Sequence, residues 1–391
     1  MSTKIPPKKR EWSWRSQAFR GVIYQLLAVG VVALGVWFLA SNTLHNMQVR
    51  GIKSGFDFLG DPAGFDIGES LFPFDSASPY WNAFLVGLVN TLRVAIVGII
   101  LTTLIGTLVG IGRFSRNALV RGLCYCYVEL FRNIPILLQL LMWYLLLTET
   151  LPLAMDAITF GPFFLSKGGL IFPKPLWEMG HLWGLIGLIG GAALAFVYRA
   201  WAFRRFESTG QIRSMFWVPL GLFVVTGVLG WWVGGAPSHF DFPFKGDFSI
   251  ERGGALTPEF LAVLLGLTLY TAAFVAEVVR AGIQSVAQGQ NEAAAALGLN
   301  PGHVMRLVTL PQALRVIIPP LTNQYLNLTK NSSLAVAIGY PDVVSIANTS
   351  LNQTGRAVEA IAIVMLVYLT TSLSTSLLMN WYNARSAIKE R

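Results

Sequence analysis

Eight runs of mostly apolar residues divide the sequence, and each is about long enough to cross a lipid bilayer as an α-helix. A transmembrane helix needs about 20 consecutive apolar residues, and segments rich in polar residues, glycine and proline separate the runs. The pattern therefore predicts an all-α integral membrane protein with about eight transmembrane helices. The predicted spans are 21–41, 84–112, 123–148, 182–201, 216–234, 259–283, 316–340 and 358–381.

The composition agrees with a membrane protein and excludes other classes. Of the 391 residues, 54% are apolar and only 13% are charged, which is about half the charged share of an ordinary soluble domain. Disordered chains and disulfide scaffolds are excluded, because the first need more charge and the second more cysteine. The two cysteines, Cys124 and Cys126, lie in an apolar run without a nearby histidine. We interpret them as small buried residues and expect no metal site.

The basic residues predict how the chain is oriented in the membrane. A net charge of +9 could indicate nucleic-acid binding in a soluble protein, but here Lys and Arg flank the apolar runs. With the N-terminus inside, 19 Lys and Arg lie in inner segments and seven in outer segments. Because inner loops carry the excess of positive charge, both termini are expected in the cytoplasm. The first run has full span length and no cleavage pattern, so it is expected to remain as an anchor.

Four segments are then expected on the periplasmic side: 42–82, 149–180, 235–257 and 341–357. Two of them, 42–82 and 235–257, combine Asp residues with aromatic residues and prolines. This composition fits a solvated acidic loop, and it also fits a surface on which a soluble partner lands.

The loop between the sixth and seventh spans, Gly289 to Pro311, predicts two short helices outside the membrane. Strong helix formers precede Gly298, which can take the left-handed conformation that ends a helix. Asn300 can cap a second helix with Pro301 at its first position, and Pro311 is expected to break that helix. Four consecutive alanines leave one flank nearly free of side chains, so another protein could approach it closely.

This loop resembles the EAA loop of importer-type ABC permeases, which has Glu-Ala-Ala, three residues, Gly, nine residues and Ile-x-Leu-Pro. The preceding Gly289-Gln290 is similar to the form in the polar amino acid permeases of the family. Val308 stands in place of the usual Ile, a mild departure. The matching positions are Glu292, Ala293, Ala294, Gly298, Leu310 and Pro311.

The resemblance extends to 84–148 and 258–385, through motifs at 90–93, at 129–135 with Gln139, and at 277–341. It implies a type I importer permease core in two parts, interrupted by an insertion with two extra spans. The long form is similar to the first permease subunit of general L-amino acid transport systems. The expected organisation is an anchor and outer loop over 1–83, core over 84–148, insertion over 149–257, and core with the coupling loop 289–311 over 258–391.

The resemblance also implies a function and an assembly. We expect a multi-pass permease of the bacterial inner membrane that moves polar L-amino acids, with no catalytic residue and no cofactor on this chain. There is no Gly-Lys dipeptide and hence no Walker A loop, so ATP and Mg²⁺ are expected on a partner ATPase that binds the coupling loop. A homologous second permease, forming a heterodimer, and a periplasmic amino-acid-binding protein are the other expected partners, besides membrane lipid.

Charged residues inside the spans form two pairs with helical i, i+3 spacing. Glu129 and Arg132 lie in the third span, and Glu277 and Arg280 in the sixth. A charge in a span costs at least about 2.5–3.5 kcal/mol unless it faces a partner or a cavity. The pairs are therefore candidates for an inner gate, or for ion pairs that fix helix packing above the coupling loop.

Within the seventh span, four polar residues share one helical face and form a stripe: Asn323, Asn327, Lys330 and Asn331. Lys330 could meet the carboxylate of an amino acid near the middle of the bilayer, or the stripe could be a hydrogen-bonded seam between helices. Arg93 and Gln139 are further candidates for the substrate pathway.

The alternative function is a secondary amino acid transporter driven by an ion gradient. Such folds often contain inverted repeats, and no convincing repeat is present here. A membrane enzyme is disfavoured because the four histidines are scattered and the carboxylates lie mostly in outer loops.

Overall fold

The computed structural model describes residues 17–49, 51, 54–211, 213–246 and 249–386. The chain divides into two compact units, residues 1–93 with 341–385 and residues 94–340 with 386–391, and each is described by itself. Several basic residues used above for the orientation lie outside the described residues, namely Lys4, Lys8, Lys9, Arg10, Arg15, Arg50, Lys53, Lys389 and Arg391.

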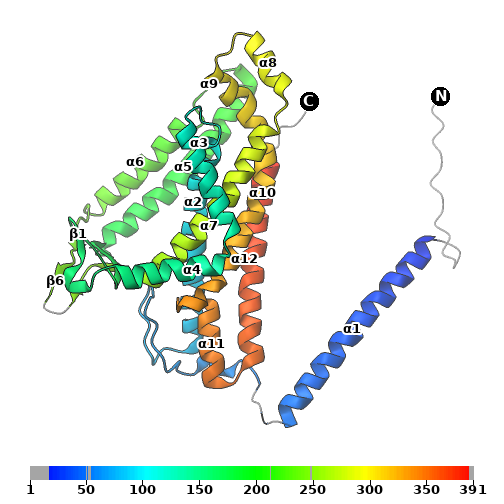
Figure 1. Cartoon of the computed structure of the whole chain (residues 1–391), viewed down its shortest axis with the longest axis vertical. Helices are drawn as coiled ribbons and strands as arrows, with labels where there is room; N and C mark the ends of the chain where they lie inside the picture. Colours follow the sequence, from blue (N-terminus) through cyan, green and yellow to red (C-terminus); the bar gives the residue numbers. More distant parts are fainter. Residues whose placement is uncertain (1–16, 50, 52–53, 212, 247–248, 387–391) are drawn as a thin grey trace. The chain divides into compact units, whose positions relative to one another are not determined.

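The first unit contains four helices and the outer segment that follows the first of them. They are α1 (Gln17–Val49), the beginning of α2 (Tyr80–Gly112), α11 (Val343–Thr354) and α12 (Ala357–Ser386) (Figure 1). The core of this unit is formed by the outer segment together with α2, α11 and α12. Its buried members include Phe58, Ala63, Tyr80, Phe84, Val343 and Ile346.

The segment 54–79 is folded against this core, although four of its five acidic residues, Asp57, Asp61, Asp66 and Asp75, are exposed. Arg356 donates to the carbonyl of Gly55 at 2.8 Å and to the carboxylate of Asp57 at 3.0 Å. The same guanidinium lies 5.9 Å from the ring centroid of Phe58. The aromatic residues that the sequence places here are therefore largely used in packing.

The second unit is organised around α7 (Pro258–Gln284), which contacts α3 (Ala118–Asn133), α4 (Ile136–Leu145) and α10 (Leu310–Asn331). Its buried residues include Val94, Leu140, Val263, Leu267, Leu328 and Tyr340. Gly106 on α2 allows a close approach to α7, because a Cβ there would lie 2.6 Å from the Cβ of Val275.

The third predicted span, 123–148, is not one straight helix. It consists of α3 and a second helical piece, α4 with a π-turn at Leu146–Thr150, and the two pieces meet at 105°. Pro135 causes the break, since it lacks the N–H that would bond the carbonyl of Phe131 in a continuous helix. The side-chain amide of Gln139 donates to that carbonyl and to the carbonyl of Ile134, both at 2.9 Å.

Residues 149–257, predicted as an insertion, form a helical hairpin and a group of short strands. Helices α5 (Met179–Thr209) and α6 (Trp217–Val233) run side by side (Figure 1). The strands were not predicted from the sequence. They form an antiparallel four-stranded sheet of β1 (Ile158–Phe160), β2 (Phe163–Ser166), β3 (Gly169–Phe172) and β8 (Gly254–Leu256), and two pairs, β4 (Lys174–Pro175) with β5 (Phe240–Asp241) and β6 (Phe244–Lys245) with β7 (Ile250–Glu251).

Among the described residues, six helices are long and apolar enough to cross a membrane, and seven if the bent pair α3–α4 counts as one span. Helix α6 is apolar but has only 17 residues. The all-α membrane fold is confirmed in its main features, and the count of eight stays a prediction.

We predict that Gln139→Leu destabilises the protein. The change leaves the buried carbonyls of Phe131 and Ile134 without donors, and each unsatisfied group costs about 1–3 kcal/mol. The purified protein should melt at a clearly lower temperature in a detergent-based thermal shift assay. The same substitution at Gln25, exposed on α1, is the matched control, and equal melting of the two variants would contradict the role given to Gln139.

Candidate functional site: the coupling loop and the intramembrane charges

The loop 289–311, predicted to couple to an ATPase, folds as a helix, a tight turn and a second helix. Helix α8 (Gln288–Ala296) ends in a Schellman motif, in which the N–H of Leu299 donates to the carbonyl of Ala294 and that of Gly298 to Ala295. Gly298 has φ +78°, a conformation that is costly for any residue with a Cβ. The side chain of Asn300 then caps α9 (Pro301–Val304) by accepting from the N–H of His303 at 2.9 Å.

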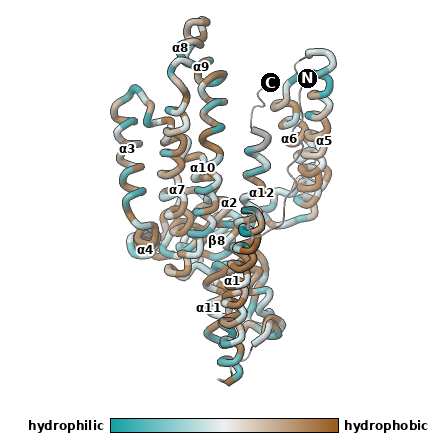
Figure 2. The backbone as a smooth tube through the Cα atoms, turned by 90° about the vertical axis from the view of Figure 1, so that its right-hand side faces the viewer, coloured by the Kyte–Doolittle hydropathy of each residue, from teal (hydrophilic) through white to brown (hydrophobic). Residues whose placement is uncertain are grey.

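The alanine flank of α8 faces outward except at one position. Ala294 is buried, whereas Glu292, Ala293, Ala295 and Ala296 are exposed. Leu297, directly after the helix, is 82% exposed. Figure 2 shows that the α8–α9 hairpin lies beyond the ends of α7 and α10 in this unit. The hairpin therefore offers a small, flat and partly apolar surface to another molecule.

Pro311 does not break the second helix, contrary to the sequence-based expectation. One helical run extends from Pro301 through Pro311 to Ile338, with a π-turn at Met305–Thr309 and a 3₁₀ segment at Ser332–Ile338. Proline has a helical φ and is tolerated in the first turn of α10. In the π-turn directly before Pro311, the backbone hydrogen bonds span five residues and not four. This change of spacing occurs where the N–H of Pro311 is missing from the ladder. Val308 and Leu310 consequently belong to this continuous run.

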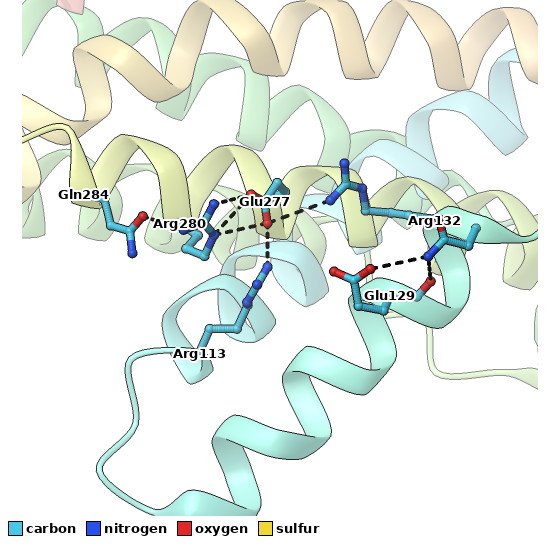
Figure 3. A network of polar contacts seen from close by, with 7 residues as sticks. Arg113, Glu129, Arg132, Glu277, Arg280 and Gln284 are labelled. Carbon is cyan, nitrogen blue, oxygen red and sulfur yellow. Dashed lines mark hydrogen bonds and ion pairs between the residues drawn. The ribbon is translucent and has the colours of Figure 1, made fainter.

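Glu277 is the centre of a network that joins three segments (Figure 3). It accepts hydrogen bonds from Arg280 on its own helix and from Arg113 after the end of α2. Arg132 on α3 lies 3.9 Å from the same carboxylate. The i, i+3 pair in α7 is therefore present, and it is part of a larger cluster.

The corresponding pair in α3 is not formed. Glu129 accepts from the side chain of Asn133, while Arg132 turns toward α7 (Figure 3). The i, i+3 spacing places both residues on one face of α3. Arg132 nevertheless forms its ion pair with Glu277 on the neighbouring helix α7. Arg113 was included above only among the 19 basic residues of the inner segments. Its position directly after a long apolar run could have indicated that it pairs with a carboxylate at the end of a span.

Arg93 and Gln139, both pathway candidates, have partners within this chain. Arg93 forms an ion pair with Glu69, which is 6% exposed in the outer segment. Gln139 is 2% exposed and bonds the carbonyls at the α3–α4 break. Glu69 was missed because a carboxylate in a loop gives no sign of burial. These contacts assign both residues a structural use.

The polar stripe of α10 faces away from the core of its own chain. Asn323, Asn327 and Lys330 are exposed and Asn331 is partly exposed. Within the described part of the chain, no hydrogen bond involves these four side chains. A seam between helices of this chain is therefore not formed. Since lipid offers no hydrogen-bond partner, the stripe must face water or another chain. The described residues contain no group of three or more His, Cys, Asp or Glu that could hold a metal ion.

Comparison with known proteins identifies the architecture. Residues 102–387 match the family described as binding-protein-dependent transport system inner membrane component. The chain belongs to this family. It is thus the membrane-embedded permease subunit of an ABC importer, a multi-pass protein of the inner membrane in bacteria.

Three relatives resemble this permease over nearly their whole length. A general L-amino acid transport system permease protein, AapQ of Rhizobium johnstonii, is 47% identical over 97% of this chain and 96% of its own. A putative amino-acid ABC transporter permease protein, YhdX of Escherichia coli, is 45% identical over 100% of both chains. The glutamate/glutamine/aspartate/asparagine transport system permease protein BztB of Rhodobacter capsulatus is 40% identical over 95% of each.

We predict that Glu277→Gln loosens the packing of α2, α3 and α7. The change removes charge-assisted hydrogen bonds worth about 1.5–3 kcal/mol each and leaves three arginines without their carboxylate. The purified permease should melt several degrees lower, while Glu207→Gln, at an exposed position near the end of α5, should melt like the unaltered protein. Unchanged melting of Glu277→Gln would show that the network does not stabilise the fold.

Proposed function

We propose that this permease moves polar L-amino acids into the bacterial cytoplasm as one subunit of an ATP-driven importer. The observation that supports this most strongly is the similarity to amino acid permeases along the entire chain, insertion included. A general L-amino acid system is the favoured subtype, because the 47% identical relative carries that name.

The energy source in this proposal is ATP with Mg²⁺ bound to a separate ATPase subunit. The docking point is the α8–α9 hairpin, whose exposed alanines and Leu297 suit a groove on a protein partner. The hairpin also has the means to pass on a movement. Thr309, at the end of the π-turn, donates to the side chain of Asn291 in α8 at 2.8 Å, and α10 continues from that turn into the membrane.

The remaining parts of the assembly are a homologous second permease and a periplasmic amino-acid-binding protein. The exposed stripe of α10 supports the second permease, because a polar helix face needs a water-filled pathway or another subunit beside it. In such a pathway Lys330 would meet the substrate carboxylate. The predicted orientation places both termini and the α8–α9 hairpin in the cytoplasm.

Coupling can be tested with Gly298→Val in a reconstituted importer. The substitution forces a branched residue into the left-handed region, at a cost of about 1–2 kcal/mol, and reshapes the hairpin without touching a neighbour, since open space surrounds this position. We expect ATP-dependent uptake of a labelled amino acid to fall strongly, together with retention of the ATPase on the permease in a pull-down. Ala293→Trp should act in the same direction by adding bulk to the docking face.

Gly289→Ala is the matched control, because it also points into open space but has an ordinary backbone conformation. Normal uptake by Gly298→Val and Ala293→Trp would overturn the coupling role. Uptake by the unaltered complex that follows an ion gradient and ignores ATP would instead favour the secondary transporter.

The orientation is tested by a single cysteine at Asp61, in a background without Cys124 and Cys126. Asp61 is exposed in the outer segment, so a membrane-impermeant thiol reagent should label it in intact cells. A cysteine at Gly302, exposed in α9, should react only after the cells are permeabilised. The reverse result would invert the topology.

A further inference from the structure

Arg132 is a charged side chain in a membrane-spanning segment whose hydrogen-bonding capacity is unused. Its nearest carboxylate oxygen, on Glu277, is 3.9 Å away, which is too far for a hydrogen bond. That carboxylate already accepts from Arg280 and Arg113. Among the described residues, no group accepts a hydrogen bond from the Arg132 guanidinium. Its five N–H donors are therefore available to a ligand.

The guanidinium is nevertheless held in place. It lies 5.3 Å from the ring centroid of Phe274, a distance at which a cation is attracted to the face of an aromatic ring. The Arg132 side chain is 35% exposed. Packing against Phe274 and attraction to Glu277 hold the guanidinium in position. Neither of these contacts is a hydrogen bond.

Glu129 offers a complementary charge one helical turn away. Its carboxylate accepts only from Asn133 among the described residues, at 3.4 Å for the side-chain bond. Residues three apart on a helix have Cβ atoms about 5–6 Å apart. No contact joins Glu129 to Arg132 in Figure 3, so the Glu129 carboxylate has no cationic partner among the described residues, although the Arg132 guanidinium is on the same helical turn.

We propose that Glu129 and Arg132 form a binding site for the zwitterionic end of an amino acid within the permease. The planar fork of Arg132 matches a carboxylate bidentately, and the Glu129 carboxylate accepts from the α-ammonium group. Every L-α-amino acid carries both groups at the same spacing, so the site recognises the class and ignores the side chain. This inference rests on the function proposed above and adds a subsite to it.

The position of the pair fits a subsite that ligands can reach. Helix α3 ends at Asn133, and the chain then turns through 105° into α4. The end of α3 is thus not continued by a helix along its axis, and both side chains lie on this last turn. The amide of Gln139 fixes the break, which keeps the last turn of α3 in position while a ligand binds.

The test is equilibrium binding of radiolabelled L-glutamine to the purified transporter complex in the absence of its binding protein. We expect saturable binding that unlabelled L-glutamate and L-leucine compete. 4-Aminobutanamide, which lacks the α-carboxylate, and N-acetyl-L-glutamine, which lacks the ammonium, should not compete. Arg132→Gln and Glu129→Gln should each weaken binding by about tenfold or more, as expected for a charge-assisted hydrogen bond, and Arg132→Lys should give an intermediate loss because it keeps the charge without the fork.

Arg280→Gln is the matched control for a packing role. Arg280 donates several hydrogen bonds within the chain, so its loss should clearly lower the melting temperature, whereas Arg132→Gln, which removes one ion pair at 3.9 Å and no hydrogen bond, should lower it less. The inference is overturned if Arg132→Gln binds glutamine normally, or if its binding falls only in proportion to lost stability. It is also overturned if the unaltered complex binds no amino acid but still imports it when the binding protein and ATP are added. Absence of ATP-dependent uptake by that full system would instead refute the proposed function.

Discussion

The constraint that shapes this permease is that a polar group in the hydrocarbon region must find its partner within protein, because lipid offers none. The α3–α4 break is possible only because the amide of Gln139 replaces the backbone donor that Pro135 lacks. The three arginines around Glu277 are tolerated because one carboxylate serves segments from different parts of the sequence. Polar residues that do not meet this condition, such as those of the α10 stripe, must face water or another subunit.

The same constraint separates structural from functional polar residues. Arg93, Arg113, Arg280 and Gln139 are bonded within the chain: Arg93 to the segment before α2, Arg113 and Arg280 to Glu277, and Gln139 to the backbone at the α3–α4 break. Arg132 and Lys330 are not hydrogen-bonded through their side chains in the described residues. A charged or polar residue in a membrane span is therefore stabilised either by bonds within this chain or by water, a ligand or another subunit. The contacts of each residue indicate which of the two applies.

The sequence was most informative where local chemistry decides the conformation. Gly298, Asn300 and Pro301 predicted the turn of the coupling loop, because a left-handed residue, a side-chain cap and a first-turn proline each have a local physical cause. Hydropathy likewise located the helices. It was less informative where tertiary partners decide. Arg132 pairs with Glu277 on α7 and not with Glu129 on its own helix. The strands of the insertion are two to four residues long, too short to show an alternating pattern, and β3 pairs with β8 across more than 80 positions.

The pairing of β3 with β8 has a consequence for how the length of this permease can change. Leu170 and Leu256 are direct partners in the sheet, so the two strands that flank the α5–α6 hairpin meet as neighbours about 5 Å apart. A segment whose ends meet can be gained or lost by a gene without displacing the helices on either side of it. The segment between β3 and β8 thus begins and ends at one place on the permease, so its length can change without moving the helices before and after it.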